Sequence, residues 1–515
     1  MGRTSKSIKN IALGIMFQLI NLSVSFVTRT YMIRFLGWEC ISLNSLFNEV
    51  IAMISMAELG VGNAIIYNLY LPLAMRDEKK ITQLMSLYKK AYLIIAAVTL
   101  FIGGVLTFFI QHIVNDIDFP TRYIQLIFFL FVIQTASSYL FSYKTSLLNA
   151  DQKKYVLHYA NIASKLAGAA LLIVIMRVTQ NYVIYLTASI AITLATNIIS
   201  SCIADHMYPF IRKKTDPLSK RERKKIFANV RDLFIKKLSG QITNSTDNIL
   251  ISVLISTLQV GFYSNYSMIF SAIKQLESQI CGGIAASIGN LFATEKPEHI
   301  RKTLNNLTFL FYVFAIWVST CLFMCASTFV KMWIGERYTM PVGIIAVCSF
   351  SIFLYIAKDP LWQSLEASGL FSKDKNISII GSSVNLVISL AAGYALGSHD
   401  LGMYGIFGGT VISQLVQIFM KIHLLHNDKL YISPHRYYFT WMKMLLSAAV
   451  SMTASYIICN NISPNGDIAR FIANGFVSSA VSIAAAFVFF FRSDEMNGAV
   501  KFARNIISRR KHKTS

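Results

Sequence analysis

The chain has 515 residues, of which 54% are hydrophobic and only 14% are charged. A soluble globular domain carries roughly 25% charged residues, so this composition and the mean hydropathy of +0.52 exclude water as the main solvent. The 48 Lys and Arg residues outnumber the 25 Asp and Glu residues. Cytoplasmic loops of membrane proteins collect such an excess, so the charge predicts no nucleic-acid partner.

Apolar stretches long enough to span a membrane recur along the whole chain. A hydrocarbon core of about 30 Å needs about twenty apolar residues. The first half of the chain contains six such spans, at residues 10–33, 40–66, 91–111, 123–148, 155–176 and 182–205. After a basic stretch at 206–237, eight more follow, at 238–256, 262–289, 303–330, 340–366, 376–397, 403–425, 437–460 and 469–491. The predicted fold class is an all-α polytopic membrane protein with about fourteen transmembrane helices.

The positions of Lys and Arg predict the orientation of these spans. Most of the basic residues fall in every second loop, counting the N-terminal segment and the C-terminal tail. The positive-inside rule places those loops in the cytoplasm, which predicts that both termini are inside. The first span follows Arg3, Lys6 and Lys9 without a small-residue cleavage site, so it is predicted to remain as an uncleaved helix.

The even number of helices in each half predicts a parallel internal repeat, because both halves then enter the membrane in the same sense. The predicted domains are an N-terminal six-helix bundle at 1–205, a basic cytoplasmic linker at 206–237, a C-terminal six-helix bundle at 238–425, two extra transmembrane helices at 426–491 and a basic cytoplasmic tail at 492–515.

No motif of a soluble enzyme is present, since the sequence lacks GxxxxGK[ST], HExxH and GxSxG patterns. The seven Cys residues form no CxxC pair and are predicted to be small core residues. The nine His residues are scattered, so neither a metal site nor a catalytic residue is predicted. Transport is the predicted activity, with no cofactor beyond a possible coupling proton or Na+.

The block at 29–92 carries a family resemblance. It contains AELG, then A-I-x-Y-x-L-Y-x-P-L-A, then K-I-x-x-L-M-x-L-Y-K-K, and a later segment reads TDNILIS followed by QVGFYSNY. In these stretches the chain resembles the bacterial polysaccharide-biosynthesis flippases of the multidrug/oligosaccharidyl-lipid/polysaccharide exporter superfamily. Cys40 and Ser42 depart from the pattern, because the family usually has Tyr and Gly there.

The resemblance implies two six-helix bundles around a central cavity, with two extra helices at the C-terminal end. It also implies a substrate, undecaprenyl-diphosphate-linked sugar repeat units that cross from the cytoplasmic to the outer leaflet of the bacterial inner membrane. Each unsatisfied polar group costs several kcal/mol in lipid, so the sugars need a polar, cationic lumen. Expected partners are this substrate and the membrane lipids, with a polymerase or export machinery as a further candidate.

Ionisable side chains at membrane depth are costly and are therefore candidates for function. Counting about 1.5 Å per residue puts Glu49, Lys165, Asp247 and Lys274 near mid-membrane and Arg29 toward the outer end. A diphosphate in a cavity of low dielectric demands cations, so Lys165 and Lys274 are predicted to hold it, and Arg29 to meet it nearer the outer face. Glu49 and Asp247 are predicted to have a coupling or gating role.

Structural alternatives remain open for several of these residues. Lys274 and Glu277 lie three apart on one helical face and could neutralise each other, and Lys165 could pair with a neighbouring helix. On an unbroken helix Glu49 and Glu58 face opposite ways, so Glu49 is assigned to the lumen and Glu58 to a structural role.

Two other functions compete with the flippase. A cation-coupled drug exporter of the same superfamily typically has twelve helices and lacks the pattern at 29–92. A membrane polysaccharide polymerase or ligase usually needs a sizeable outer loop, and the predicted outer loops here are short. The helix count and the loop lengths favour the flippase.

Overall fold

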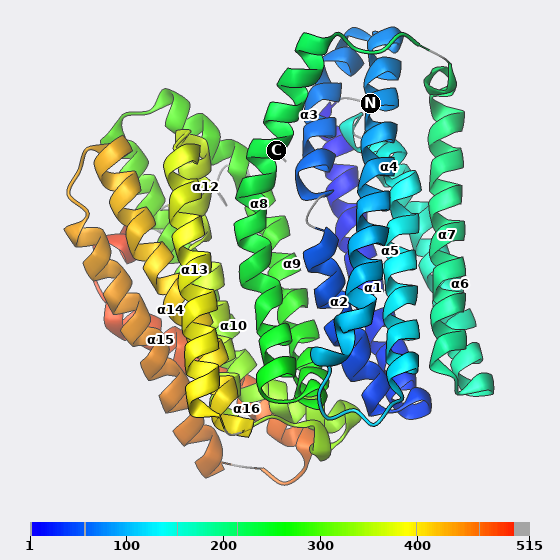
Figure 1. Cartoon of the computed structure of the whole chain (residues 1–515). Coiled ribbons are helices and arrows are strands. Elements are labelled where there is room, and N and C mark those ends of the chain that lie inside the picture. Colours follow the sequence, from blue (N-terminus) through cyan, green and yellow to red (C-terminus); the bar gives the residue numbers. More distant parts are fainter. Residues whose placement is uncertain are drawn as a thin grey trace. The chain divides into compact units, whose positions relative to one another are not determined.

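The computed structural model describes residues 3–55, 58–151, 153–213, 215–397, 399–462 and 464–498, and in these ranges the chain is helical and has no β-strand (Figure 1). Contacts divide the chain into two compact units, the first ending at Gly261 and the second beginning at Phe262. Each unit is described separately.

The first unit consists of eight long helices and the start of a ninth. Their bounds are α1 (Arg3–Leu36), α2 (Trp38–Ile54), α3 (Glu58–Met75), α4 (Glu78–Phe109), α5 (Thr121–Ala150), α6 (Lys154–Thr179), α7 (Tyr182–Met207) and α8 (Lys220–Leu254), with short 3-10 turns η2 (Ile110–His112) and η3 (Pro209–Arg212). Helix α4 packs on α5, α1 on α6, and α8 on α2 and α3. A buried core of aromatic and aliphatic side chains joins α3, α4 and α5 around Tyr88, Tyr92 and Tyr139.

The second unit contains most of α9 (Thr257–Thr294) and the helices that follow it. These are α10 (Pro297–Ile334), α11 (Val342–Ala357), α12 (Asp359–Ser368), α13 (Phe371–Leu396), α14 (His399–Leu425), α15 (His435–Ile462) and α16 (Asp467–Phe490), with η4 (Glu336–Tyr338) and the π-helical turn η5 (His426–Leu430). Helix α13 lies side by side with α14, and α10 packs on α11, α15 and α16.

Hydroxyl groups hold α10 against α15 in the second unit. The Tyr312 hydroxyl lies 2.6 Å from Ser447 Oγ, and Thr320 Oγ1 lies 3.1 Å from Ser451 Oγ. Lipid tails are as apolar as leucine, so helices in a bilayer associate through close packing of small residues and through such hydrogen bonds. This seam is the packing expected of a membrane protein.

The starts of several helices are fixed by local hydrogen bonds. Asp77 accepts a hydrogen bond from the Lys80 amide at the start of α4, and Asn181 accepts two from the first turn of α7. Ser219 and Glu222 form a reciprocal capping box at the start of α8. Side-chain caps of this kind satisfy amides that have no partner within the helix.

Every predicted span falls on one helix or on two consecutive helices, and ten are confirmed as long and apolar enough to cross a membrane within the described residues. The ten correspond to α4, α5, α6, α7, α10, α11 with α12, α13, α14 with η5, α15 and α16. The predicted spans at 10–33, 40–66, 238–256 and 262–289 fall on α1, on α2 with α3, on α8 and on α9, and stay predictions as membrane spans.

Two details differ from the sequence analysis. The span predicted at 40–66 is not one helix, because α2 ends at Ile54 and α3 begins at Glu58, so Glu49 and Glu58 lie on different helices. The structural division also lies later than the predicted linker at 206–237, because α8 packs on α2 and α3 and so belongs to the first unit. Most of the predicted tail at 492–515 lies outside the described residues.

Candidate functional site

In the first unit, Arg29 projects from α1 toward polar groups. Its guanidinium donates a hydrogen bond to Ser45 Oγ of α2 at 3.4 Å. The phenols of Tyr182 and Tyr185, at the start of α7, interact with it electrostatically. Arg29 is half-buried at this junction of three helices. A cation at such a junction can bind an anion or hold the helices together.

Glu49 and Asp247 are brought to the same helix interface. Glu49 of α2 accepts a hydrogen bond from Asn248 Nδ2 of α8 at 3.2 Å. Asp247 precedes Asn248 and is buried, with an exposed fraction of 9%. The structure therefore places both acidic residues of the predicted coupling role where α2 packs on α8. Glu58 of α3 has a different contact, since it accepts a hydrogen bond from Tyr92 of α4 at 3.4 Å.

Lys165 lies in the middle of α6, within a candidate membrane span, and its side chain is exposed. It has no ion pair or hydrogen bond with any of the residues that the structure describes. The predicted structural alternative, a pairing with a neighbouring helix, therefore finds no partner in the described part of the chain.

In the second unit, a proline distorts the helix that carries two adjacent half-buried charges. Helix α11 ends at Ala357 and α12 starts at Asp359, with Pro360 in its first turn and Lys358 at the junction. Proline lacks an amide hydrogen and clashes with the preceding turn, so it kinks a helix at this point. The kink sets Lys358 and Asp359 among the neighbouring helices of the unit rather than at the end of a span.

Lysines and aromatic rings alternate along this region, and we call the set of Lys274, Tyr355, Lys358, Trp362 and Lys421 the lysine–aromatic ladder. The Lys274 amine of α9 lies 5.1 Å from the Tyr355 ring centre, and Lys358 lies 4.9 Å from that ring and 4.5 Å from the Trp362 ring. The Lys421 amine of α14 lies 3.8 Å from the Trp362 ring centre. Aromatic faces attract cations, so the rings keep three positive charges close together.

Acidic residues flank the ladder at both ends. At one end, Lys421 pairs with Asp374 of α13 at 2.6 Å, and the two side chains are only 1% and 9% exposed. At the other end, the carboxylate oxygens of Glu277 and Asp359 and the Cys281 sulfur all lie within 4.8 Å of one another. The Cys281 thiol donates a hydrogen bond to Glu277 Oε1 at 2.8 Å.

These contacts change the sequence-based view of Lys274 and Glu277. From the sequence, Lys274 has two candidate roles, substrate binding and neutralisation by Glu277. Both roles rest on one face of the helix that carries these two residues. The structure adds Tyr355 beside Lys274, and Cys281 and Asp359 beside Glu277. The Glu277 carboxyl thus faces a second acid, Asp359, and also interacts electrostatically with Lys358.

Sequence reasoning missed Lys358, Asp359 and Lys421 as members of the site. The sequence-based selection of charges near mid-membrane does not include these three residues, although Lys421 is buried in α14. An Asp-Pro step inside an apolar span was the available signal, because it indicates a kink that can hold polar groups.

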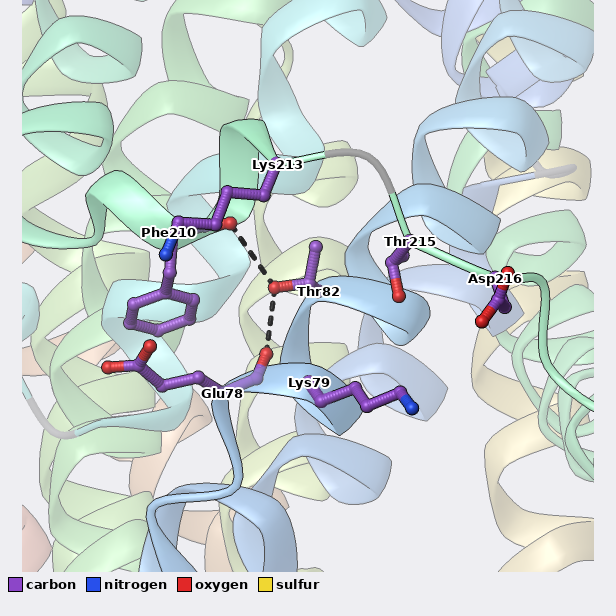
Figure 2. Close-up of a pocket in the computed structure, with 7 residues that line it drawn as sticks. All are labelled: Glu78, Lys79, Thr82, Phe210, Lys213, Thr215 and Asp216. Atoms are coloured by element: carbon purple, nitrogen blue, oxygen red, sulfur yellow. Dashed lines mark hydrogen bonds between the residues drawn. The ribbon is translucent and has the colours of Figure 1, made fainter.

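A separate cavity of about 580 Å³ lies in the first unit beside the start of α4 (Figure 2). Thr82 forms part of one wall. Its hydroxyl donates hydrogen bonds to the backbone carbonyls of Glu78 and Phe210. The lining contains two acidic residues, Glu78 and Asp216, and two lysines, Lys79 and Lys213. Among these described lining residues the charges balance, which favours neither an anionic nor a cationic ligand.

Comparison with known proteins gives one family match in sequence. Residues 7–283 match the family model described as polysaccharide biosynthesis protein. Among curated proteins, no sequence match to the chain was found.

Solved structures of transporters have the same fold. The chain is similar to a lipid II flippase, MurJ, in an inward closed conformation, with a TM-score of 0.63 and 13% identity over 92% of this chain and 99% of the other. It is also similar to a multidrug resistance MATE family transporter of the MOP superfamily in an inward-facing conformation, with a TM-score of 0.59 and 13% identity over 82% and 98%. A third similar structure is the MATE multidrug transporter DinF-BH, with a TM-score of 0.60 and 13% identity over 83% and 96%.

Proposed function

This chain belongs to the polysaccharide biosynthesis protein family, and from that premise we propose that it is a flippase for undecaprenyl-diphosphate-linked oligosaccharides. It moves precursor repeat units of O-antigen, capsule or exopolysaccharide from the inner to the outer leaflet of a bacterial inner membrane by alternating access. The family supports a role in polysaccharide synthesis, and the shared fold with a flippase and with exporters supports transport rather than catalysis.

The lysine–aromatic ladder carries this proposal. A diphosphate brings two or more negative charges into a medium of low dielectric and requires cationic partners there. Lys274 and Lys358 supply two such charges, both against the Tyr355 ring. Lysine binds phosphate as a compact point charge, so it can release the substrate without breaking a bidentate clamp. In the first unit we assign Arg29 and Lys165 to the same chemical group of the substrate.

Two carboxyl groups of the first unit suit a coupling role. Glu49 and Asp247 lie where α2 packs on α8, and a bound proton or Na+ would change the charge of that interface. We assign the coupling step to these acids. Substrate movement should then respond to an imposed proton or Na+ gradient, and an identical rate with and without either gradient would overturn the assignment.

The proposed orientation has both termini in the cytoplasm, with the segment between α7 and α8 on the same side. A cysteine at the exposed position Asp216 should therefore be protected in intact cells from a membrane-impermeant thiol reagent and should react after the cells are opened. The unchanged chain, in which Cys202 is exposed, gives the background. Labelling of Asp216→Cys above that background in intact cells would contradict the orientation.

Deletion of the gene tests the function in cells. Surface polysaccharide should be lost while the lipid-linked precursor is still made and accumulates in the inner leaflet. The measurement is mass spectrometry of extracted lipid-linked sugars together with staining of surface glycan. Normal surface glycan in a strain without a redundant paralogue would rule the proposal out.

A further inference from the structure

A polar cavity of about 270 Å³ lies between α5, α6 and α7 in the first unit. Of the eight described residues that line it, seven have hydrogen-bonding side chains, including Asn149, Asn161 and Asn197. No Lys, Arg, Asp or Glu is among those eight. At about 30 Å³ per water molecule, the space holds about nine waters, and so accommodates one small ring rather than a chain of several.

The amides of this cavity are available to a ligand. The buried Asn197 Nδ2 has no hydrogen-bond partner among the described residues, and none of those residues bonds the Asn161 side chain. A buried amide without a partner is unfavourable, so an occupant that hydrogen-bonds, either water or a ligand that displaces it, is expected there. An asparagine amide both donates and accepts, which matches the hydroxyls of a sugar. Because none of the eight described lining residues is Lys, Arg, Asp or Glu, this lining favours a neutral group over a phosphate.

Lys165 continues the polar face of α6 beyond the cavity. His158, Asn161 and Lys165 follow one another at helical spacings of three and four residues, so they share one side of α6. The rise from Asn161 to Lys165 is about 6 Å. A polar cavity without Lys, Arg, Asp or Glu among its eight described lining residues is thus followed, one turn along the helix, by a lysine with no ion pair in the described part of the chain.

We propose that the α5–α6–α7 cavity binds the sugar ring attached directly to the carrier diphosphate, and that Lys165 binds the diphosphate. This inference rests on the proposed function, since it names the part of the lipid-linked oligosaccharide that the first unit recognises. The order of the two proposed binding groups along α6, first the cavity and then Lys165, agrees with the proposed orientation. The cavity lies near the last turns of α5 and α7 and the first turns of α6, which the proposed orientation places toward the cytoplasm, and Lys165 lies about one turn further along α6.

Saturation-transfer NMR on the purified full chain in lipid nanodiscs tests the cavity with free N-acetylglucosamine, glucose and galactose. At least one of these sugars should bind the unchanged protein. The double variant Asn161→Leu with Asn197→Leu should bind that sugar about tenfold or more weakly, because each lost neutral hydrogen bond reduces affinity severalfold. Lys165→Met should keep free-sugar binding but bind geranyl diphosphate more weakly, with the remaining affinity supplied by Lys274 and Lys358 of the ladder.

Gln134→Leu is the matched control, because it removes an amide from the α5–α7 interface outside the cavity lining. It should bind the sugar like the unchanged protein, and thermal unfolding of each variant reports whether it is folded. Binding of none of the three sugars, or equal binding by the folded double variant, overturns the inference.

These measurements test the proposed sugar subsite separately from the proposed flippase function. Free-sugar binding does not require lipid movement, so sugar binding without flipping would refute the proposed function and leave the subsite in place. Normal flipping by the Asn161→Leu with Asn197→Leu variant would refute the subsite and leave the flippase in place.

Discussion

Lys421→Met is expected to destabilise the second unit by about 3–5 kcal/mol, because it leaves the Asp374 carboxylate buried without its partner. At roughly 2–4 °C per kcal/mol for a unit of this size, the apparent unfolding temperature should fall by about 10 °C. The loss includes the contact of the Lys421 amine with the Trp362 ring. Thermal unfolding of the purified protein in detergent measures the shift.

The double variant Lys421→Met with Asp374→Leu shows whether the lost stability comes from the broken ion pair or from lost packing of the lysine side chain. Replacing both members of a buried ion pair by apolar side chains is often neutral or stabilising, so most of the lost stability should return. Asp374 also lies in the first turn of α13, where the helix dipole favours a negative charge, so complete recovery is not expected. An unfolding temperature of Lys421→Met equal to that of the unchanged protein would show that the pair is not structural.

Lys274→Ala and Lys358→Ala are expected to lower the rate of substrate movement at least about 30-fold each. Truncating one partner of a desolvated charge pair costs about 2–5 kcal/mol, which is the free energy lost when the diphosphate loses one lysine. Lys274→Arg should retain part of the activity, since arginine keeps the positive charge but carries it on a planar guanidinium instead of a compact ammonium. The measurement is complementation of a deletion strain at matched expression.

Two comparisons separate substrate binding from a structural role of Lys274. If Lys274 only neutralises its acidic neighbour, Lys274→Ala with Glu277→Ala should recover activity, whereas the binding role predicts that the double variant fails. Lys443→Ala is the matched control, because that lysine also lies against a ring, 4.8 Å from the Phe439 centre, but on α15 outside the ladder. Loss of activity in Lys443→Ala equal to that in Lys274→Ala would contradict a specific role of the ladder.

The helical fold could be predicted from sequence because length and hydropathy determine it almost alone. An apolar stretch of twenty residues must satisfy its own backbone in lipid and therefore becomes a helix. The break between α2 and α3 was not predictable in this way, because no proline or charge run separates Ile54 from Glu58. The division after Gly261 depends on how α8 packs, which hydropathy does not report.

The family departure at Ser42 has a structural setting that the sequence did not show. A Cβ atom on Gly261 would lie 2.1 Å from Ser42 Oγ, so the backbone at Gly261 approaches α2 closely within the first unit. The two stretches that carry the family resemblance therefore touch. At position 42 of α2 the family usually has Gly. This chain has the larger Ser42 there, and it has Gly261 on α9.

The candidate site was predictable only in part, because depth along a helix is read from sequence but side-chain neighbours are not. Counting residues identified Lys274 and Lys165 as cations at membrane depth. The ladder requires α9, α11, α12 and α14 to converge, and their order in the chain does not reveal this. The polar face of α6 at His158, Asn161 and Lys165 was readable by helical spacing, but the cavity depends on Asn149 and Asn197 from two other helices.

Lipid movement by the purified protein tests the central claim most directly. Undecaprenyl-diphosphate-linked oligosaccharides extracted from the deletion strain are placed in vesicles with the protein, and the fraction accessible to an added glycosidase is followed over time. The unchanged protein should make the inner-leaflet fraction accessible, and Lys274→Ala should do so at least about 30-fold more slowly. Accessibility no faster than in protein-free vesicles, together with uptake of a cationic dye by the same preparation, would contradict the flippase and identify a drug exporter.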